Sequence, residues 1–114
     1  MIKKKLSKNA KKIDQFLIKY LKRQKKSLLV KPMKYGVISG GKKIRSTIIF
    51  DTGKIFSLSQ NKLVNICAAV ECIHSYSLIH DDLPCMDDDV IRRGKPSTHI
   101  KFGEASAVLA GSSL

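Results

Sequence analysis

A long helical stripe of apolar side chains constrains the fold more than any other feature of the sequence. Between residues 63 and 78, apolar and small side chains recur three or four positions apart: Leu63, Ile66, Cys67, Val70, Ile73, Ser77 and Leu78. This period matches a helix of about 3.6 residues per turn and not the alternation of a strand. The stripe therefore predicts a long helix that runs into Asp81, with Ser59 as a weak start signal.

The remaining segments favour helices as well. Apolar residues at helical spacing among lysines predict an amphipathic helix over about residues 9–26. Further helices are predicted from about Lys31, over residues 44–56 and from Phe102 onward, with a break at Gly40 and Gly41 and a turn-rich stretch over residues 84–99. No run alternates as a strand would, so we predict an all-α fold. The length of 114 residues suits a single domain over 1–114.

The positive charge of the chain is concentrated at its start. The formal net charge is +13, yet residues 1–45 hold 16 Lys and Arg against one acid, Asp14, and residues 46–114 hold 6 against 8. A basic amphipathic helix within residues 1–26 is typical of a solvated helix face, or of a module that binds nucleic acid or an anionic membrane surface. No aromatic residue recurs regularly among the lysines for stacking on bases, so we favour the solvated face and expect no nucleic-acid partner.

The cysteines and the apolar runs bear on the compartment. Cys67, Cys72 and Cys85 are odd in number and lack metal-site spacing, which is typical of reduced intracellular thiols. Lysines interrupt the first residues before any signal-peptide core can form, and no apolar run approaches a membrane span. We therefore expect a cytoplasmic protein without a membrane span.

An acidic cluster follows the long predicted helix. Asp81, Asp82, Asp87, Asp88 and Asp89 place five carboxylates within nine residues. Such a group repels itself unless a cation is bound, and hard oxygen ligands suit Mg²⁺, which completes its shell with water and phosphate oxygens. A solvated acidic turn is the alternative for a bare acidic run.

Cations near the cluster favour a site for a metal and a diphosphate together. Arg92 and Arg93 follow directly, and an arginine fork fits phosphate oxygens. His74 precedes Asp81 by two helical turns and projects from nearly the same face. Upstream, a glycine pair and three cations stand at the start of a predicted helix, where anions bind readily: Gly40-Gly41-Lys42-Lys43-Ile44-Arg45.

The backbone must deform for the acids to meet. Asp81 and Asp87 are six residues apart, which separates them by about 120° around an ideal helix. Pro84 lies between them and cannot continue the helical hydrogen bonds. We therefore predict a local bulge at residues 83–86 that brings Asp81 and Asp87 together.

These motifs resemble those of the trans-prenyl diphosphate synthases, and most closely the bacterial farnesyl diphosphate synthases. Residues 81–87 are similar to the first aspartate-rich motif of that family, DDxxxxD, and residues 40–45 to its GGKxxR motif. The resemblance covers about residues 33–111, within a motif-bearing region of 33–114, and several separated motifs agree in order and spacing. It implies the amino-terminal part of a large helical bundle, and a homodimer in the complete enzymes.

The resemblance also implies roles for single residues. Lys42, Arg45, His74 and Arg93 would bind isopentenyl diphosphate, and Arg92 would contact the allylic diphosphate. Asp81 and Asp87 would ligate Mg²⁺, with Asp82 in support, as the catalytic aspartates. The implied reaction condenses isopentenyl diphosphate with dimethylallyl or geranyl diphosphate to give farnesyl diphosphate. Tyr76, five residues before Asp81, would limit the product to fifteen carbons.

The sequence also departs from the family pattern. Lys43 stands where the family commonly has Arg, and residues 112–114 replace the usual continuation after Gly111. The second aspartate-rich motif is absent from the 114 residues, so we expect an incomplete prenyltransferase with uncovered apolar helix faces. Two alternatives remain open at this point: a non-catalytic remnant of such an enzyme, and a basic module that binds nucleic acid or a membrane surface.

Overall fold

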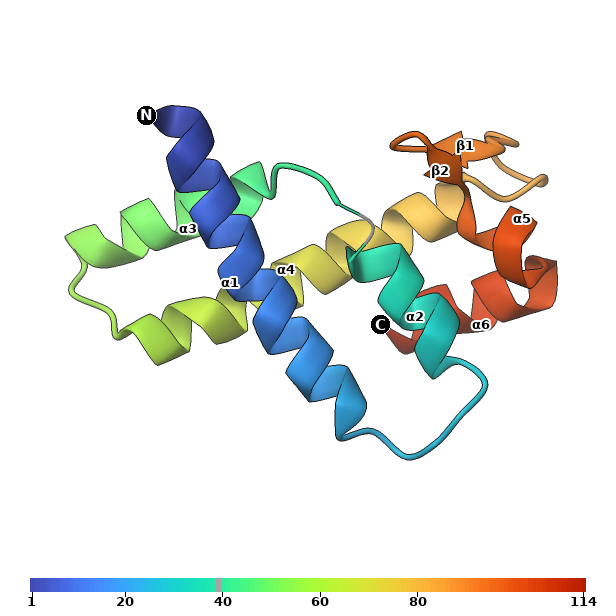
Figure 1. The fold of residues 1–114 in the computed structure, drawn as a ribbon, viewed down its shortest axis with the longest axis horizontal. Coiled ribbons are helices and arrows are strands. Elements are labelled where there is room, and N and C mark those ends of the chain that lie inside the picture. Colours follow the sequence, from blue (N-terminus) through green and yellow to red (C-terminus); the bar gives the residue numbers. More distant parts are fainter. Residues whose placement is uncertain (39) are drawn as a thin grey trace.

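The structure, a computed structural model, describes residues 1–38 and 40–114. Within these residues it contains six helices and a two-stranded hairpin. The helices are α1 (Ile2–Lys22), α2 (Val30–Ile38), α3 (Ile44–Ile55), α4 (Gln60–Asp81), α5 (Thr98–Phe102) and α6 (Glu104–Ser113), and the strands are β1 (Ile91–Arg92) and β2 (Lys95–Pro96) (Figure 1). The all-α prediction is confirmed.

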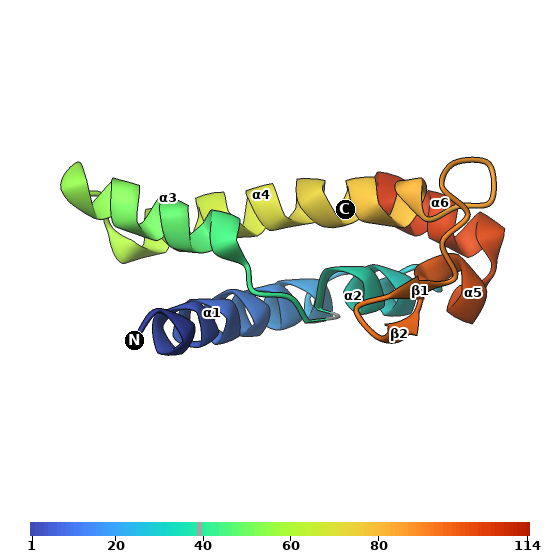
Figure 2. The same ribbon diagram turned by 90° about the horizontal axis from the view of Figure 1, so that it is seen from above.

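The helices form two layers with the core between them. Figure 2 shows α1 and α2 in one layer and α3, α4 and α6 in the other. The side chains that fill the space between the layers come from α1, α2, α3 and α4: Ile13, Leu17, Leu21, Val37, Phe50, Leu63, Cys67 and Ala68. Their burial removes apolar area from water and holds the layers together.

The long central helix α4 is close to its prediction. It begins after Ser59, whose hydroxyl accepts a hydrogen bond from the backbone N–H of Lys62 at 3.4 Å, and it ends at Asp81. A serine in this position satisfies one of the free N–H groups at a helix start. By length and composition α4 is the one helix of the described residues that could cross a membrane, a test that core helices of soluble proteins also pass.

The first helix differs from its prediction. It spans Ile2–Lys22 instead of about 9–26, so it begins seven residues earlier and ends four earlier. Lysines are good helix formers, and no Gly or Pro interrupts residues 2–22. Asn9 adds a tertiary contact near the helix start, because its side-chain amide donates to the Thr47 hydroxyl of α3 at 3.0 Å.

The hairpin was not predicted from the sequence. β1 and β2 pair antiparallel, with Ile91 opposite Pro96 and Arg92 opposite Lys95. Arg93 and Gly94 form the turn between the strands, with φ of 54° and 74°. Two successive residues at positive φ are typical of the tightest hairpin turns. Strands of two residues are too short to show alternation, so the sequence pattern could not reveal them.

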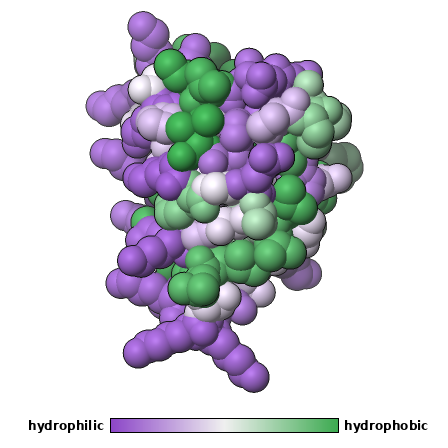
Figure 3. All heavy atoms as spheres, turned by 90° about the vertical axis from the view of Figure 1, so that its right-hand side faces the viewer, coloured by the Kyte–Doolittle hydropathy of each residue, from purple (hydrophilic) through white to green (hydrophobic). Residues whose placement is uncertain are grey.

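Several apolar side chains lie on the surface, as expected. On α4, Ile66 is 45% exposed and Ile73 is 64% exposed, and on α6 Leu109 is 54% exposed. Figure 3 views the end of the molecule that carries the hairpin, α5 and α6, where hydrophobic residues gather in patches between polar ones. These apolar side chains of α4 and α6 are therefore not covered by the described residues.

Candidate anion and metal site

The acidic turn at the end of α4 folds back on itself. The Asp87 N–H donates to the Asp81 carbonyl at 2.8 Å, and the N–H groups of Met86 and Asp88 donate to the Leu83 carbonyl at 2.9 and 3.0 Å. The chain leaves the helix before Pro84, since proline cannot donate to the next helical hydrogen bond. The predicted bulge is thus confirmed in the backbone, and it brings Asp87 back beside Asp81.

The donor set near this turn suits a metal that also takes ligands from a substrate. Asp81 is half-buried and Asp87 is exposed. Across residues 1–38 and 40–114, no group of three or more His, Cys, Asp or Glu side chains could hold a metal by itself. Mg²⁺ binds in proteins through one or two carboxylates and fills its remaining positions with water and phosphate oxygens. Asp81 and Asp87 are thus two carboxylates of the kind that Mg²⁺ takes, and a metal here would need its remaining ligands from outside the described side chains.

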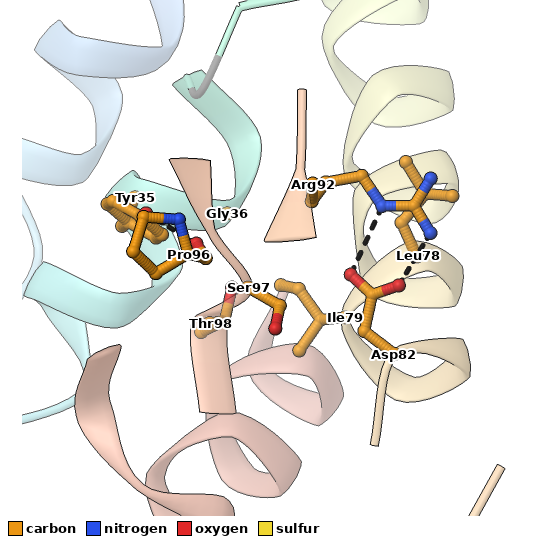
Figure 4. A pocket seen from close by; sticks show the side chains of 9 residues that line it. All are labelled: Tyr35, Gly36, Leu78, Ile79, Asp82, Arg92, Pro96, Ser97 and Thr98. Carbon is orange, nitrogen blue, oxygen red and sulfur yellow. Dashed lines mark hydrogen bonds and ion pairs between the residues drawn. The ribbon is translucent and has the colours of Figure 1, made fainter. Parts of the chain in front are cut away.

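Asp82 is buried and binds Arg92. Its side chain is 3% exposed, and its carboxylate accepts hydrogen bonds from Arg92 Nε, at 3.1 Å, and from Nη2. Figure 4 shows the two side chains meeting in this bidentate pair beside Leu78 and Ile79. The hydrogen bonds to Asp82 raise the pKa of Arg92 above its usual range. The adjoining cavity, about 20 Å³, has room for about one water molecule and is too small for a substrate.

The glycine pair shapes the loop between α2 and α3. Gly40 and Gly41 have φ of 98° and 97°, a region that side chains disfavour. A Cβ atom at Gly41 would lie 2.6 Å from the guanidinium carbon of Arg93, so a larger residue would collide with that side chain. The loop thus permits Arg93 to approach its backbone, where Arg93 Nη1 donates to the Gly40 carbonyl.

The three cations of this loop separate into two groups. Lys42 and Arg45 are exposed, as an anion site needs. Lys43 is 7% exposed and turns inward, where its ammonium lies 3.0 Å from Asp14 Oδ1. The sequence groups the three cations at one helix start, and the structure separates Lys43 from the other two. The backbone at Lys43 is left-handed, with φ of 46° and ψ of 48°.

His74 connects the loop to α4. Its Nε2 lies 3.3 Å from Arg45 Nη1, and the predicted pairing of these two residues in one site is consistent with that contact. Burial lowers the pKa of His74 below its usual value, and Arg45 lowers it further; Glu71 opposes the shift, and Arg93 and Arg92 add to it. The ring is therefore neutral near pH 7 and surrounded by positive charge. This cluster offers hydrogen-bond donors to an anion, and Glu71 is the acid that acts on His74.

Two further histidines pack within the fold. His80 bonds the Val108 carbonyl at 3.0 Å and packs edge-on against Tyr76, with ring centroids 5.1 Å apart. His99 is buried in α5. Sequence reasoning missed Asp14 and Glu71, which hold Lys43 and Ser46 inside the fold. The sequence held one signal for the role of Asp14, which is the sole acid among the first 45 residues.

The fold and the site together define a class, the helical isoprenoid-synthase fold with an acidic turn and a cationic loop on adjoining elements. The sequence profile of the polyprenyl synthetase family matches residues 26–114. The chain belongs to this family.

Individual members of the family are similar to this chain in sequence and in structure. The chain is 57% identical over 86 residues to the farnesyl diphosphate synthase of Escherichia coli K12, covering 75% of this chain and 29% of that protein. It is 56% identical over 89 residues to the farnesyl diphosphate synthase of Buchnera aphidicola, covering 78% and 32%. A crystal structure of an FPP/GFPP synthase from Zymomonas mobilis superposes with a TM-score of 0.92 at 40% identity, over 98% of this chain and 41% of that one. The chain spans about a third of the length of the curated relatives it matches.

Proposed function

We propose that this chain forms part of a Mg²⁺-dependent prenyltransferase. The reaction joins isopentenyl diphosphate to dimethylallyl diphosphate to give geranyl diphosphate, and a second isopentenyl diphosphate to geranyl diphosphate to give farnesyl diphosphate. Each addition releases one inorganic diphosphate. Relatives named farnesyl diphosphate synthase support this class of reaction. The observation that carries the proposal is the cluster of Arg45, His74 and Arg93 beside the helix that ends at Asp81.

The cationic cluster would bind the diphosphate of isopentenyl diphosphate. Lys42 and Arg45 are exposed at the start of α3, and Arg93 lies against the same loop. Arginine forks donate in parallel to phosphate oxygens, and lysine adds a mobile charge. His74 is neutral and donates or accepts one hydrogen bond without adding charge. These residues would hold the nucleophilic substrate in a fixed direction.

The acidic turn would hold the allylic substrate. Asp81 and Asp87 would share Mg²⁺ with its diphosphate, and Arg92, fixed by Asp82, would stabilise the same group. When bound, Mg²⁺ supplies a Lewis acid that stabilises the negative charge of the departing diphosphate. The allylic carbon then loses its C–O bond, the double bond of isopentenyl diphosphate forms a new C–C bond to it, and a proton leaves the adjacent carbon.

Product length and compartment are further parts of the proposal. Tyr76 is 42% exposed on α4, five residues before Asp81, and its ring packs against His80. A bulky ring there supports a limit at fifteen carbons. A cytoplasmic location is supported by three free cysteines and by water-soluble diphosphate substrates.

Calorimetric titration of isopentenyl diphosphate, with and without MgCl₂, tests the proposal. Arg45→Gln removes one charge-assisted contact and should weaken binding by about 1.5–3 kcal/mol, or roughly 10- to 150-fold. Lys54→Gln, at the exposed far end of α3, is the matched control and should bind as the unchanged chain does. Equal affinity for all three proteins would refute the assigned site. Asp81→Ala should remove any Mg²⁺ dependence of pyrophosphate binding.

A further inference from the structure

The side chain of Lys43 is buried although its residue type is almost always solvated. Only 3% of the side chain is exposed, and its ammonium lies 3.0 Å from Asp14 Oδ1 and 3.5 Å from the Val37 carbonyl. A buried ammonium without a partner is strongly unfavourable, so this position depends on Asp14. The contact joins α1 to the loop before α3, across 28 intervening residues of sequence.

The backbone at Lys43 is also unusual. Its φ and ψ are 46° and 48°, the left-handed conformation, and it immediately precedes the first residue of α3. For a residue with a Cβ atom this conformation costs about 1 kcal/mol and persists only when other contacts impose it. The ion pair with Asp14 is the contact that can impose it here, because it fixes the end of the same side chain.

The residues on either side of Lys43 are the proposed diphosphate ligands. Lys42 precedes it and Arg45 follows two positions later, and both are exposed. Turning Lys43 inward leaves Lys42 in solvent, and the backbone at Lys43 sets the direction in which α3 begins. A change at Lys43 would therefore displace both ligands together.

A second contact joins the same loop to another element. Arg93, at the turn of the hairpin, donates to the Gly40 carbonyl, while Asp14 reaches the loop from α1. Arg93 is itself a proposed ligand and is exposed. Asp14 is half-buried and has no such role, so its contribution can be separated from direct binding.

We propose that the buried Asp14–Lys43 ion pair is a positioning device for the anion-binding loop. It holds Lys43 in the left-handed conformation and thereby aims Lys42 and Arg45 at a diphosphate group. Neither Asp14 nor Lys43 touches that group. The assignment of a diphosphate to this loop rests on the proposed function, whereas the effect of the ion pair on the loop backbone does not.

Amide hydrogen exchange tests the positioning directly. The Gly40 N–H donates to the Ile38 carbonyl at 2.7 Å, and the Thr47 N–H donates to the Lys43 carbonyl at 3.2 Å. Asp14→Asn should accelerate exchange of these two amides by about tenfold relative to Leu63, whose N–H donates at the start of α4. Equal acceleration of all three amides would mean a general loss of stability and would overturn the proposal.

Binding of inorganic pyrophosphate supplies the functional readout. Asp14→Asn should weaken it by about tenfold, and Lys43→Arg, which keeps the charge and the reach, should stay within about threefold of the unchanged chain. In a Lys43→Met background, Asp14→Asn should change affinity less than twofold, because the partner is already gone. Full additivity of the two changes would overturn the proposal.

The exposed Lys5–Asp51 pair provides a matched control. It also joins α1 to α3, at 2.7 Å, but both side chains are nearly half exposed. Asp51→Asn should leave loop exchange and pyrophosphate affinity within about twofold, as expected for a surface pair. If the unchanged chain binds no pyrophosphate, the proposed function fails for this chain, while the exchange of Gly40 and Thr47 still decides whether the ion pair positions the loop.

Discussion

Removing Arg92 should destabilise the fold more than removing its partner Asp82. The two residues form a bidentate pair in which the Asp82 side chain is 3% exposed and the Arg92 side chain is 33% exposed. Arg92→Met leaves a carboxylate that cannot reach water. Asp82→Asn leaves a guanidinium that can swing into solvent, and the asparagine oxygen still accepts one hydrogen bond.

The burial of the pair determines how much each substitution should lower the free energy of unfolding. Breaking a fully buried ion pair costs about 3–5 kcal/mol, and partial exposure of Arg92 places Arg92→Met near the lower end, about 3 kcal/mol. Asp82→Asn should cost about 1–2 kcal/mol, the typical loss of one charged hydrogen bond. Adding Asp82→Asn to Arg92→Met should recover part of the loss, because the unpaired buried charge is gone.

Urea unfolding followed by circular dichroism measures these differences. Arg23→Met is the matched control, since Arg23 is exposed at the end of α1 and should change the free energy of unfolding by less than about 0.5 kcal/mol. Equal unfolding midpoints for Arg92→Met and Arg23→Met would refute the reasoning. So would a larger loss for Asp82→Asn than for Arg92→Met.

Two further predictions concern packing and pH. Gly53→Ala should destabilise the fold by about 1–2 kcal/mol in urea unfolding, because the new Cβ would overlap the buried Leu63 side chain and the better helix propensity of Ala offsets only part of that cost. Thr52→Ala, on the exposed side of α3, is the control. Equal stability of the two variants would contradict the predicted overlap. His74 has a lowered pKa, so the unfolded chain takes up its proton first and stability should fall as pH drops below 6.5. Comparing unfolding at about pH 7.5 and 5.5 tests this sign, and His74→Gln should flatten the difference; an unchanged slope would show that other groups cause it.

The sequence predicted those parts of the fold that local chemistry governs. Ser59 marks the start of α4 because its hydroxyl can satisfy a free N–H within one turn. Pro84 predicts the end of the helix and the return of the chain toward Asp81, since proline removes a hydrogen bond wherever it stands. These effects act over a few residues, so no knowledge of distant partners was needed.

The site could be predicted as a set of residues but only in part as an arrangement. Arg45 and His74 were assigned to one anion site, and they do contact each other. Their assignment came from motif spacing, which records residue types and not directions. The same motif leaves position 43 unspecified, and only the structure shows that Lys43 is buried against Asp14.

The sequence by itself determined the helices, the acidic turn and the identity of the candidate ligands, because periodicity, proline and charge act locally. Only the tertiary structure decided which cation faces inward, since Lys43 needs Asp14 from another helix, and which backbone Arg93 contacts, since Gly40 lies 53 residues away. It also decided that Asp82 pairs with Arg92, because this ion pair forms only where the hairpin returns over the end of α4. A charge that is buried away from water needs a partner of opposite charge, and the position of that partner depends on how the helices pack.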